Sequence, residues 1–217
     1  NPSTENIKKI ISLGKVYNKV FVIDNSNNKH DIEQRNNIVY FWNGKNNGLS
    51  YSYNLALQKS LENKIDYLCV LDQDSDFLVN DINVMNSFIY EHLELLKNIA
   101  MIVPKIHYQH CDENVRVDER EFEQVEWAIS SGSYHNVRLL KDNQIAYDEN
   151  YFIDRCDADI CMQIRRKKLE ILQCNRAVLH QELGEANGHR HTSHAPLRHY
   201  YIFRNRLYYN KKYYSLL

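Results

Sequence analysis

The stretch Tyr67–Asp74, which reads YLCVLDQD, decides the fold of this chain. Residues 67–71 are apolar at every position, a pattern typical of a strand that is buried on both faces of a parallel sheet. The run ends directly in Asp72-Gln73-Asp74. Because ligands of parallel sheets collect beyond the carboxyl ends of the strands, these acids predict a binding site at one edge of the sheet.

The neighbouring segments alternate between helical and strand patterns. A helix start at Ser3-Thr4 is followed by apolar residues at helical spacing over 7–13, ending near Gly14. Helical patterns also cover 51–61 and 81–97, and short β-branched runs cover 19–24, 38–42 and 100–103, the last ending at Pro104. Farther along, we expect strands at 127–133 and 171–179 and a helix at 157–168. The alternation predicts an α/β fold of the Rossmann-like type, with a mixed, mostly parallel sheet flanked by helices.

We expect a single domain over residues 1–217. Its parts are a nucleotide-binding half (1–104), an acceptor and catalytic half (105–195) and a basic, Tyr-rich C-terminal helix (196–217). The net charge of −1 argues against nucleic acid as a partner. Five cysteines without a CxxC pair argue against disulfides and structural zinc, which favours a cytoplasmic location.

The acids of the triplet have a metal interpretation and a structural one. In an extended backbone, the side chains of Asp72 and Asp74 point to the same side. Two carboxylates at the end of a buried strand are costly unless a cation or hydrogen bonds compensate them. Mg²⁺ or Mn²⁺ would suit such a corner together with phosphate oxygens. The alternative is a turn with helix-capping acids.

Further candidates lie at other strand and helix ends. Asp24 ends the strand 19–24 and either contacts a nucleotide or closes an Asx-turn. Asp157 and Asp159 diverge by about 200° on a helix, so one can act as a base while another acid caps the helix or faces water. His180 follows the strand 171–179 and either completes a metal site with Asp74 or is structural.

Seven segments of the chain resemble those of the family 2 glycosyltransferases of the GT-A fold, and within them the rhamnosyltransferase-like branch. The segments are VIDNSNN (Val22–Asn28), NNGLSYSYNLAL (Asn46–Leu57), VLDQDS (Val70–Ser75), SSGS (Ser130–Ser133), FIDRCDADICMQIR (Phe152–Arg165), VLHQELGE (Val178–Glu185) and APLRHYYIFRNRLYY (Ala195–Tyr209). They occur in the order of the family and cover nearly the whole chain.

The resemblance implies a role for each matching position. Asp157 is implied as the catalytic base, although Cys156 stands where the family commonly has Glu. The nucleotide site would comprise Asp24, Asn47 and Asp72, the metal site Asp74 and His180, and the substrate site Gly132, Asp154, Arg198, Tyr200 and Arg204.

The implied reaction is the inverting transfer of a sugar to a glycan or lipid-linked acceptor with Mg²⁺ or Mn²⁺. The donor would be dTDP-rhamnose, which makes L-rhamnose the sugar, or a UDP-hexose. A nucleotidyltransferase is a second possibility, but the six glycines form no phosphate-binding loop motif. A non-catalytic module that binds nucleotide sugars or carbohydrate is a third.

Two expectations concern the ends of the sequence. Relatives begin with a central strand that ends in a Thr-Tyr-Asn-Pro-like turn, whereas this sequence opens with Asn1-Pro2. We therefore expect a sheet that lacks this strand, so that its two neighbours have unpaired backbone groups. In the tail, cations alternate with tyrosines, which suits the inner face of an anionic membrane. The alternative is a helix that packs Tyr200, Phe203 and Leu207 onto the domain; the oligomeric state stays open.

Overall fold

The computed structural model describes residues 2–32, 35–108, 120–181, 186–187, 191–192 and 196–214. The helices are α1 (Thr4–Leu13), α2 (Leu49–Glu62), α3 (Val79–Glu91), the 3₁₀ helix η1 (Leu95–Asn98), α4 (Val137–Asp142), α5 (Cys156–Arg166) and α6 (Pro196–Tyr213). The strands are β1 (Val20–Asp24), β2 (Ile38–Trp42), β3 (Tyr67–Cys69), β4 (Ser75–Phe77), β5 (Ile99–Tyr108), β6 (Phe122–Val125), β7 (Tyr134–Asn136), β8 (Glu170–Gln181), β9 (Ala186–Asn187) and β10 (His191–Thr192).

The main sheet is mixed and has the order β3-β7-β5-β8-β4, with β6 also paired to β8. Strands β5 and β8 are parallel, and β3 and β5 are both antiparallel to β7. The strands β3, β5 and β8 therefore run in one direction. A second sheet consists of the parallel strands β1 and β2. The predicted α/β fold, with a mixed, mostly parallel sheet and flanking helices, is confirmed.

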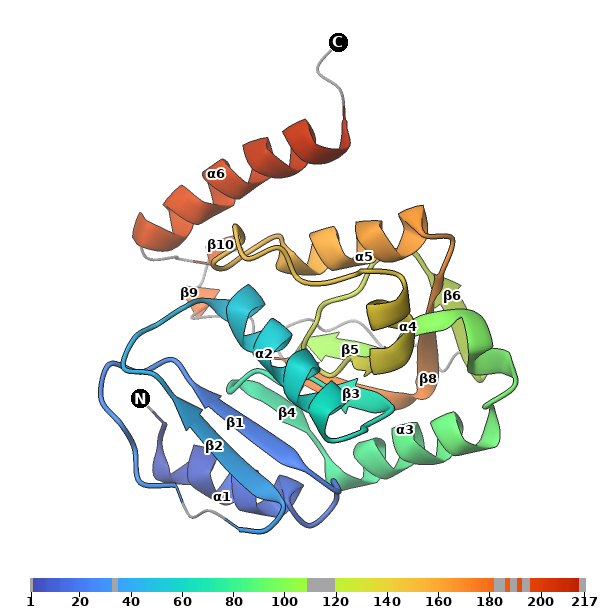
Figure 1. Cartoon of the computed structure of the whole chain (residues 1–217), viewed down its shortest axis with the longest axis horizontal. Helices are drawn as coiled ribbons and strands as arrows, with labels where there is room; N and C mark the ends of the chain where they lie inside the picture. Colours follow the sequence, from blue (N-terminus) through green and yellow to red (C-terminus); the bar gives the residue numbers. More distant parts are fainter. Residues whose placement is uncertain are drawn as a thin grey trace.

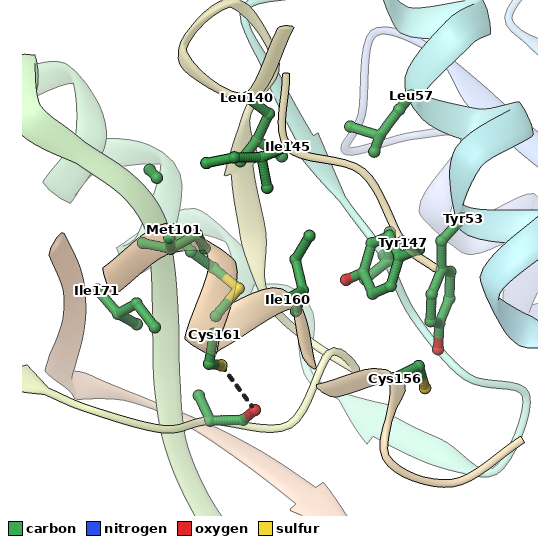
Figure 2. Close-up of a cluster of buried hydrophobic side chains, with 14 of the residues drawn as sticks. Tyr53, Leu57, Met101, Leu140, Ile145, Tyr147, Cys156, Ile160, Cys161 and Ile171 are labelled. Carbon is green, nitrogen blue, oxygen red and sulfur yellow. Dashed lines mark hydrogen bonds between the residues drawn. The ribbon is translucent and has the colours of Figure 1, made fainter. Parts of the chain in front are cut away.

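Helices cover both faces of the main sheet. Figure 1 shows α2, α4 and α5 on one side and α1 and α3 on the other. Each side has its own apolar core: Tyr53, Met101 and Ile160 belong to the first, shown in Figure 2, and Met85 and Phe88 to the second. The continuous apolar runs in the sequence thus correspond to strands buried between two layers of helices.

Several boundaries differ from the sequence-based expectation. The strand predicted at 100–103 passes through Pro104, where its pairing with β8 shifts register. Proline has no backbone N–H to donate, so an irregularity is where a strand tolerates it. The helix predicted at 81–97 is divided into α3 and η1. The strand predicted at 127–133 is wrong: the strand is β6, at 122–125.

A cavity of about 720 Å³ separates β1 from β3. Both are edge strands, since β1 pairs only with β2 and β3 only with β7 among the described residues. Their facing edges line the cavity together with Ile10 and Leu13 of α1. This is the arrangement expected of a sheet that lacks one internal strand between two neighbours.

Candidate functional site

The carboxyl ends of β1 and β3 meet at the first turns of α2. After β1, the Asn25 side-chain amide donates to the Ser52 hydroxyl (3.0 Å). After β3, the Tyr53 hydroxyl donates to Asp72 Oδ1 (2.6 Å). Two consecutive residues of α2 therefore hold the two strand ends at one edge, which is the edge that the sequence predicts for ligands.

The carboxylate of Asp24 organises the loop after β1. It accepts hydrogen bonds from the Ser26 amide (2.8 Å) and the Tyr40 hydroxyl (2.7 Å), and His30 Nδ1 lies 2.8 Å away. Burial alone would raise the pKa of Asp24, but these hydrogen bonds outweigh it and lower the pKa to about 2. The predicted Asx-turn is thus present, and a carboxylate has further lone pairs with which to accept from a nucleotide.

Asn47 has an unsatisfied donor beside this loop. Its backbone N–H reaches Asn25 Oδ1 (3.4 Å), but its side-chain Nδ2 is buried and has no hydrogen-bond partner among the described residues. An unpaired buried donor costs about 1–3 kcal/mol. The position of Asn47, predicted as part of the nucleotide site, is therefore one where a ligand oxygen would be stabilising.

The acidic triplet forms a turn and not an extended strand end. The Ser75 amide donates to the Asp72 carbonyl (3.3 Å), and the chain reverses into β4. The geometric premise that Asp72 and Asp74 share one side of an extended strand is therefore wrong. Asp74 is exposed, whereas Asp72 is largely covered.

Asp72 has a strongly shifted pKa. Burial raises it to about 6, the Tyr53 hydrogen bond opposes the rise, and the charges of Asp157 and Asp74 add to it. Three acids thus lie close enough to influence one another, which is the electrostatic setting of many functional sites.

Lys9 of α1 is the cation of this corner, and the sequence analysis missed it. Its ammonium donates to the backbone oxygens of Gln73 (3.4 Å) and Ser75. Burial lowers the pKa of Lys9, while the charges of Asp76, Asp74 and Asp72 raise it. In the sequence, nothing distinguishes Lys9 from its neighbour Lys8, because only the docking of α1 against the turn brings it here.

The structure separates the roles of the acids in α5. Asp157 Oδ1 accepts from the Ser130 amide (3.0 Å), and burial raises the pKa of Asp157. Asp159 is fully buried and accepts from Lys212 and from the Tyr213 hydroxyl, each at 2.7 Å. Of the two, only Asp157 lies in the acidic group around Asp72.

Of the two predicted metal ligands, Asp74 lies in a turn and His180 in strand β8. His180 of β8 lies in register with Asp76 of β4 and His107 of β5, and the Nδ1 atoms of the two histidines are 3.3 Å apart. Asp74 lies two residues before Asp76, in the turn that precedes β4. Asp76 and His107 are therefore candidate ligands that the sequence analysis did not name.

Within the described residues, a group of three closely spaced metal-ligating side chains occurs only at Glu91, His92 and Glu121. There, Glu121 already forms an ion pair with Arg176 (2.7 Å). Among the described residues, Asp74 and His180 are thus not part of such a closely spaced group of three.

Gly132 is explained by packing. It has a φ of +78°, and a Cβ there would lie 3.0 Å from Leu179 and 3.2 Å from Pro104. Its amide also donates to the Val70 carbonyl (2.8 Å) and so ties this turn to the end of β3. The predicted contact of Gly132 with substrate stays a prediction.

Helix α6 holds the loop that precedes α5. Arg204 donates to the Asn150 carbonyl (2.7 Å), and the buried Asn205 amide donates to the carbonyls of Ile153 (2.6 Å) and Asp154 (3.0 Å). Arg198 forms an ion pair with Asp154 Oδ1 (3.3 Å). Two of the predicted substrate residues, Arg198 and Arg204, thus position the loop, which no local sequence pattern indicates.

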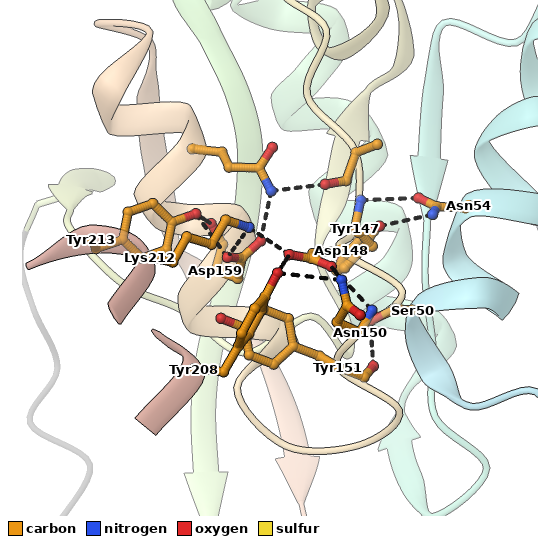
Figure 3. A network of polar contacts seen from close by, with 12 residues as sticks. Ser50, Asn54, Tyr147, Asp148, Asn150, Tyr151, Asp159, Tyr208, Lys212 and Tyr213 are labelled. Atoms are coloured by element: carbon orange, nitrogen blue, oxygen red, sulfur yellow. Dashed lines mark hydrogen bonds and ion pairs between the residues drawn. The ribbon is translucent and has the colours of Figure 1, made fainter. Parts of the chain in front are cut away.

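A polar network fixes the other end of α6. Figure 3 shows Lys212 between Asp148 and Asp159, with Tyr208 and Tyr213 donating to the same carboxylates. The expectation that Tyr200, Phe203 and Leu207 pack onto the domain is wrong, because these side chains are 59%, 69% and 72% exposed. Asn205 and Tyr209 of the helix are buried against the domain, and Tyr200, Phe203 and Leu207 are left on the outer face. Contact of that face with a membrane stays a prediction.

No described helix is both long and apolar enough to cross a bilayer. No protein-family model and no curated protein matches the chain.

Solved structures do match it. S. aureus TarS aligns with a TM-score of 0.62 and 17% identity, over 83% of this chain and 35% of that chain. TarS 1–349 in complex with UDP-GlcNAc aligns with a TM-score of 0.63 and 16% identity, over 93% of this chain and 62% of that chain. GalNAc-T7 with UDP, GalNAc and Mn²⁺ aligns with a TM-score of 0.57 and 13% identity, over 76% of this chain and 38% of that chain. The chain therefore spans less than two thirds of the length of each of these structures. At these identities the likeness establishes the fold, which is the predicted GT-A fold.

Proposed function

We propose that this chain is the donor-binding and catalytic part of a metal-dependent glycosyltransferase that uses a nucleoside-diphosphate sugar. The observation that carries the proposal is the gathering of Asp72, Asp74 and Asp157 at the sheet edge where β1 and β3 end. The GT-A fold supports it, and so do the structures with UDP, UDP-GlcNAc and GalNAc that share this fold.

The nucleotide would bind at the end of β1. Asp24 is held ionised by its hydrogen bonds and can accept from the base, and the unpaired Nδ2 of Asn47 can donate to a donor oxygen. Asp72 would accept from the ribose. UDP-hexose and dTDP-rhamnose are both candidate donors, and we favour a UDP sugar because the matching structures contain UDP.

A divalent cation fits the acidic corner. Burial raises the pKa of Asp72, the charges of Asp157 and Asp74 add to the rise, and the nearby cation Lys9 opposes it. Asp74 and His180 would hold Mg²⁺ or Mn²⁺, which at this place neutralises charge on the diphosphate leaving group. The oxygen and imidazole donors suit Mn²⁺, the ion named with GalNAc-T7.

Asp157 would be the base. Burial raises its pKa and so strengthens it as a proton acceptor, while the Ser130 amide fixes its Oδ1. Asp157 would take the proton of the acceptor hydroxyl as the hydroxyl oxygen attacks the anomeric carbon of the donor sugar. The nucleoside diphosphate would leave from the opposite face of that carbon. The configuration at that carbon would therefore be inverted.

The test is a panel of nucleotide sugars with Mn²⁺ or Mg²⁺, assayed for transfer or hydrolysis with the wild type and Asp157→Asn. We expect turnover of one donor by the wild type and a loss of about 10²–10⁴-fold in the variant. Nucleotide binding without turnover of any donor would indicate a non-catalytic binding module. Conversion of a nucleotide sugar and added pyrophosphate into a nucleoside triphosphate and a sugar 1-phosphate would indicate a nucleotidyltransferase.

A further inference from the structure

We propose that Trp127 is the stacking platform of an acceptor subsite that takes one neutral pyranose ring beside Asp157. This inference rests on the proposed function, because it assigns the acceptor side of the same site. It concerns a second cavity, of about 300 Å³, lined by Trp127, Asp154, Arg155, Asp157, Ala158 and Ile202. That volume lies at the lower end of the range for small-molecule sites.

The indole of Trp127 is exposed, and the residues on either side of it contact helix α5. The side chain is 55% exposed. On one side, Glu126 forms an ion pair with Arg165 (3.1 Å), and on the other the Ala128 carbonyl accepts from the Cys161 thiol (3.6 Å). A tryptophan on a fixed loop presents a large, rigid apolar surface to solvent, at little entropic cost to a ligand that stacks on it.

Asp154 provides a second, independent indication of a ligand. Its Oδ1 is paired with Arg198, but its Oδ2 is buried and has no hydrogen-bond partner among the described residues. A buried carboxylate oxygen without a donor is unfavourable, so a ligand hydroxyl in the cavity would be stabilising.

The backbone at this position is also strained. Asp154 and Arg155 have φ values of +61° and +68°, a conformation that side chains rarely adopt. Strain of this kind persists where the surrounding structure imposes it, and it clusters at ligand sites. Here, the Asn205 amide imposes it by binding the carbonyls of Ile153 and Asp154.

These features select the class of ligand. A pyranose has an apolar C–H face, which suits the negative face of an indole, and hydroxyl groups at its edge, which suit carboxylates. Arg155 in the lining and Arg198, which pairs with Asp154, balance the charges of Asp154 and Asp157. The cavity therefore has no excess of cations to hold a phosphate group, and its indole and unpaired carboxylate oxygen favour a sugar. A ring stacked on Trp127 with a hydroxyl on Asp154 Oδ2 would lie beside the base Asp157. The entering group is therefore a sugar hydroxyl and not a lipid phosphate.

The chain offers a direct optical test, since it has two tryptophans, Trp42 and Trp127. In Trp42→Phe, the emission reports on Trp127 alone. We expect saturable changes in this emission on titration with methyl pyranosides or disaccharides, and no change with glycerol phosphate. Asp154→Asn in the same background keeps the side-chain shape but replaces the unpaired oxygen, and should weaken the response at least tenfold. In saturation-transfer NMR, Trp127→Ala should abolish pyranoside binding and Trp127→Phe should retain part of it.

Calorimetry with UDP and Mn²⁺ on the same proteins separates the two proposals. UDP binding without any effect of pyranosides on Trp127 would overturn the acceptor subsite and leave the proposed function intact. A response to glycerol phosphate alone would also overturn it. Pyranoside binding at Trp127 without UDP binding would support the sugar site and overturn the proposed function.

Discussion

The ionisation of Asp72 links the site to the stability of the fold. Its pKa is about 6 in the folded protein, against 3.8 for an unperturbed aspartate. Because this pKa is raised on folding, Asp72 contributes stability that is fully present below pH 4 and is lost as the pH rises through 6. The difference between the two pKa values corresponds to about 3 kcal/mol in the free energy of unfolding. The ligand-free protein should thus be destabilised by its own site near neutral pH.

We therefore expect the free energy of unfolding of the wild type to fall, relative to Asp72→Asn, by up to about 3 kcal/mol between pH 4 and pH 7. Asp24 does not contribute in this range, because its pKa is lowered to about 2 and its stabilisation is lost only in stronger acid. Urea unfolding of both proteins at several pH values provides the measurement. If the free energies of unfolding of the wild type and Asp72→Asn change in parallel with pH, the pKa of Asp72 is not raised by folding.

Asp74 and His180 are expected to carry the metal affinity. Asp74→Asn and His180→Ala should each weaken Mn²⁺ binding in the presence of UDP by tenfold or more, because an open site has few protein ligands to lose. Asp142→Asn is the matched control, an exposed acid on α4 that forms an ion pair with the exposed Arg138 (3.7 Å). Isothermal titration measures the change. If Asp76→Asn weakens binding and Asp74→Asn does not, the ligand is Asp76, which lies opposite His180.

At the residue scale, the sequence predicted which residues lie at the ligand-binding edge of the sheet better than it predicted their backbone conformation and contacts. Asp24 and Asp72 could be placed at one edge because apolar strands precede them. The turn at Gln73-Asp74 could not be predicted, because the same letters suit a strand end or a turn. Lys9 and the unpaired oxygen of Asp154 depend on contacts between segments distant in sequence, which no local pattern encodes.

At the scale of elements, α6 is fixed to the domain by buried charge. Asp159 is fully buried and Lys212 is its cationic partner. Burial alone would lower the pKa of Lys212, but the hydrogen bonds that it donates to Asp148 and Asp159 raise the pKa, so the lysine stays charged. Removing one partner of a buried pair leaves an uncompensated charge, which costs about 3–5 kcal/mol.

Lys212→Met should therefore destabilise the protein by about 3 kcal/mol or more, and Lys211→Met, at the exposed neighbouring position, by less than about 0.5 kcal/mol. Asp159→Asn combined with Lys212→Met should recover part of the loss. Denaturant unfolding monitored by circular dichroism provides the comparison. Equal, small effects of the two lysine substitutions would show that the network in Figure 3 contributes little.

Among the described residues, β1 pairs only with β2 and β3 only with β7, so the edges that face the cavity have no strand partner. Amides without partners open with little free energy, so hydrogen exchange should be faster in residues 20–24 and 67–69 than in 99–103 of the central strand β5. Mass-spectrometric exchange of the ligand-free protein measures this. Equal protection of all three segments would mean that the cavity edges are closed in solution.

Element types were predictable and their limits were less so. The boundaries of β2 were predicted residue for residue, because its apolar run is bounded by turn residues. The division of the helix predicted at 81–97 and the passage of β5 through Pro104 follow from tertiary packing and pairing with β8. The outward apolar face of α6 could not be foreseen, since its polar side chains are satisfied only by distant acids.

At the scale of the whole molecule, the two layers of helices and the mixed sheet hold three groups at one edge: the loop after β1, the acidic turn after β3 and the start of α5. The central claim is that these form a site for a nucleoside diphosphate and a divalent cation. Coupling between the two ligands is what distinguishes such a site from an acidic turn that binds cations weakly.

Isothermal titration of the wild-type chain with UDP, in the presence and absence of Mn²⁺, tests this claim most directly. We predict saturable binding with Mn²⁺, at least tenfold weaker binding without it, and a corresponding loss in Asp74→Asn. UDP affinity that does not depend on Mn²⁺, or no binding of UDP or dTDP under either condition, would contradict the account.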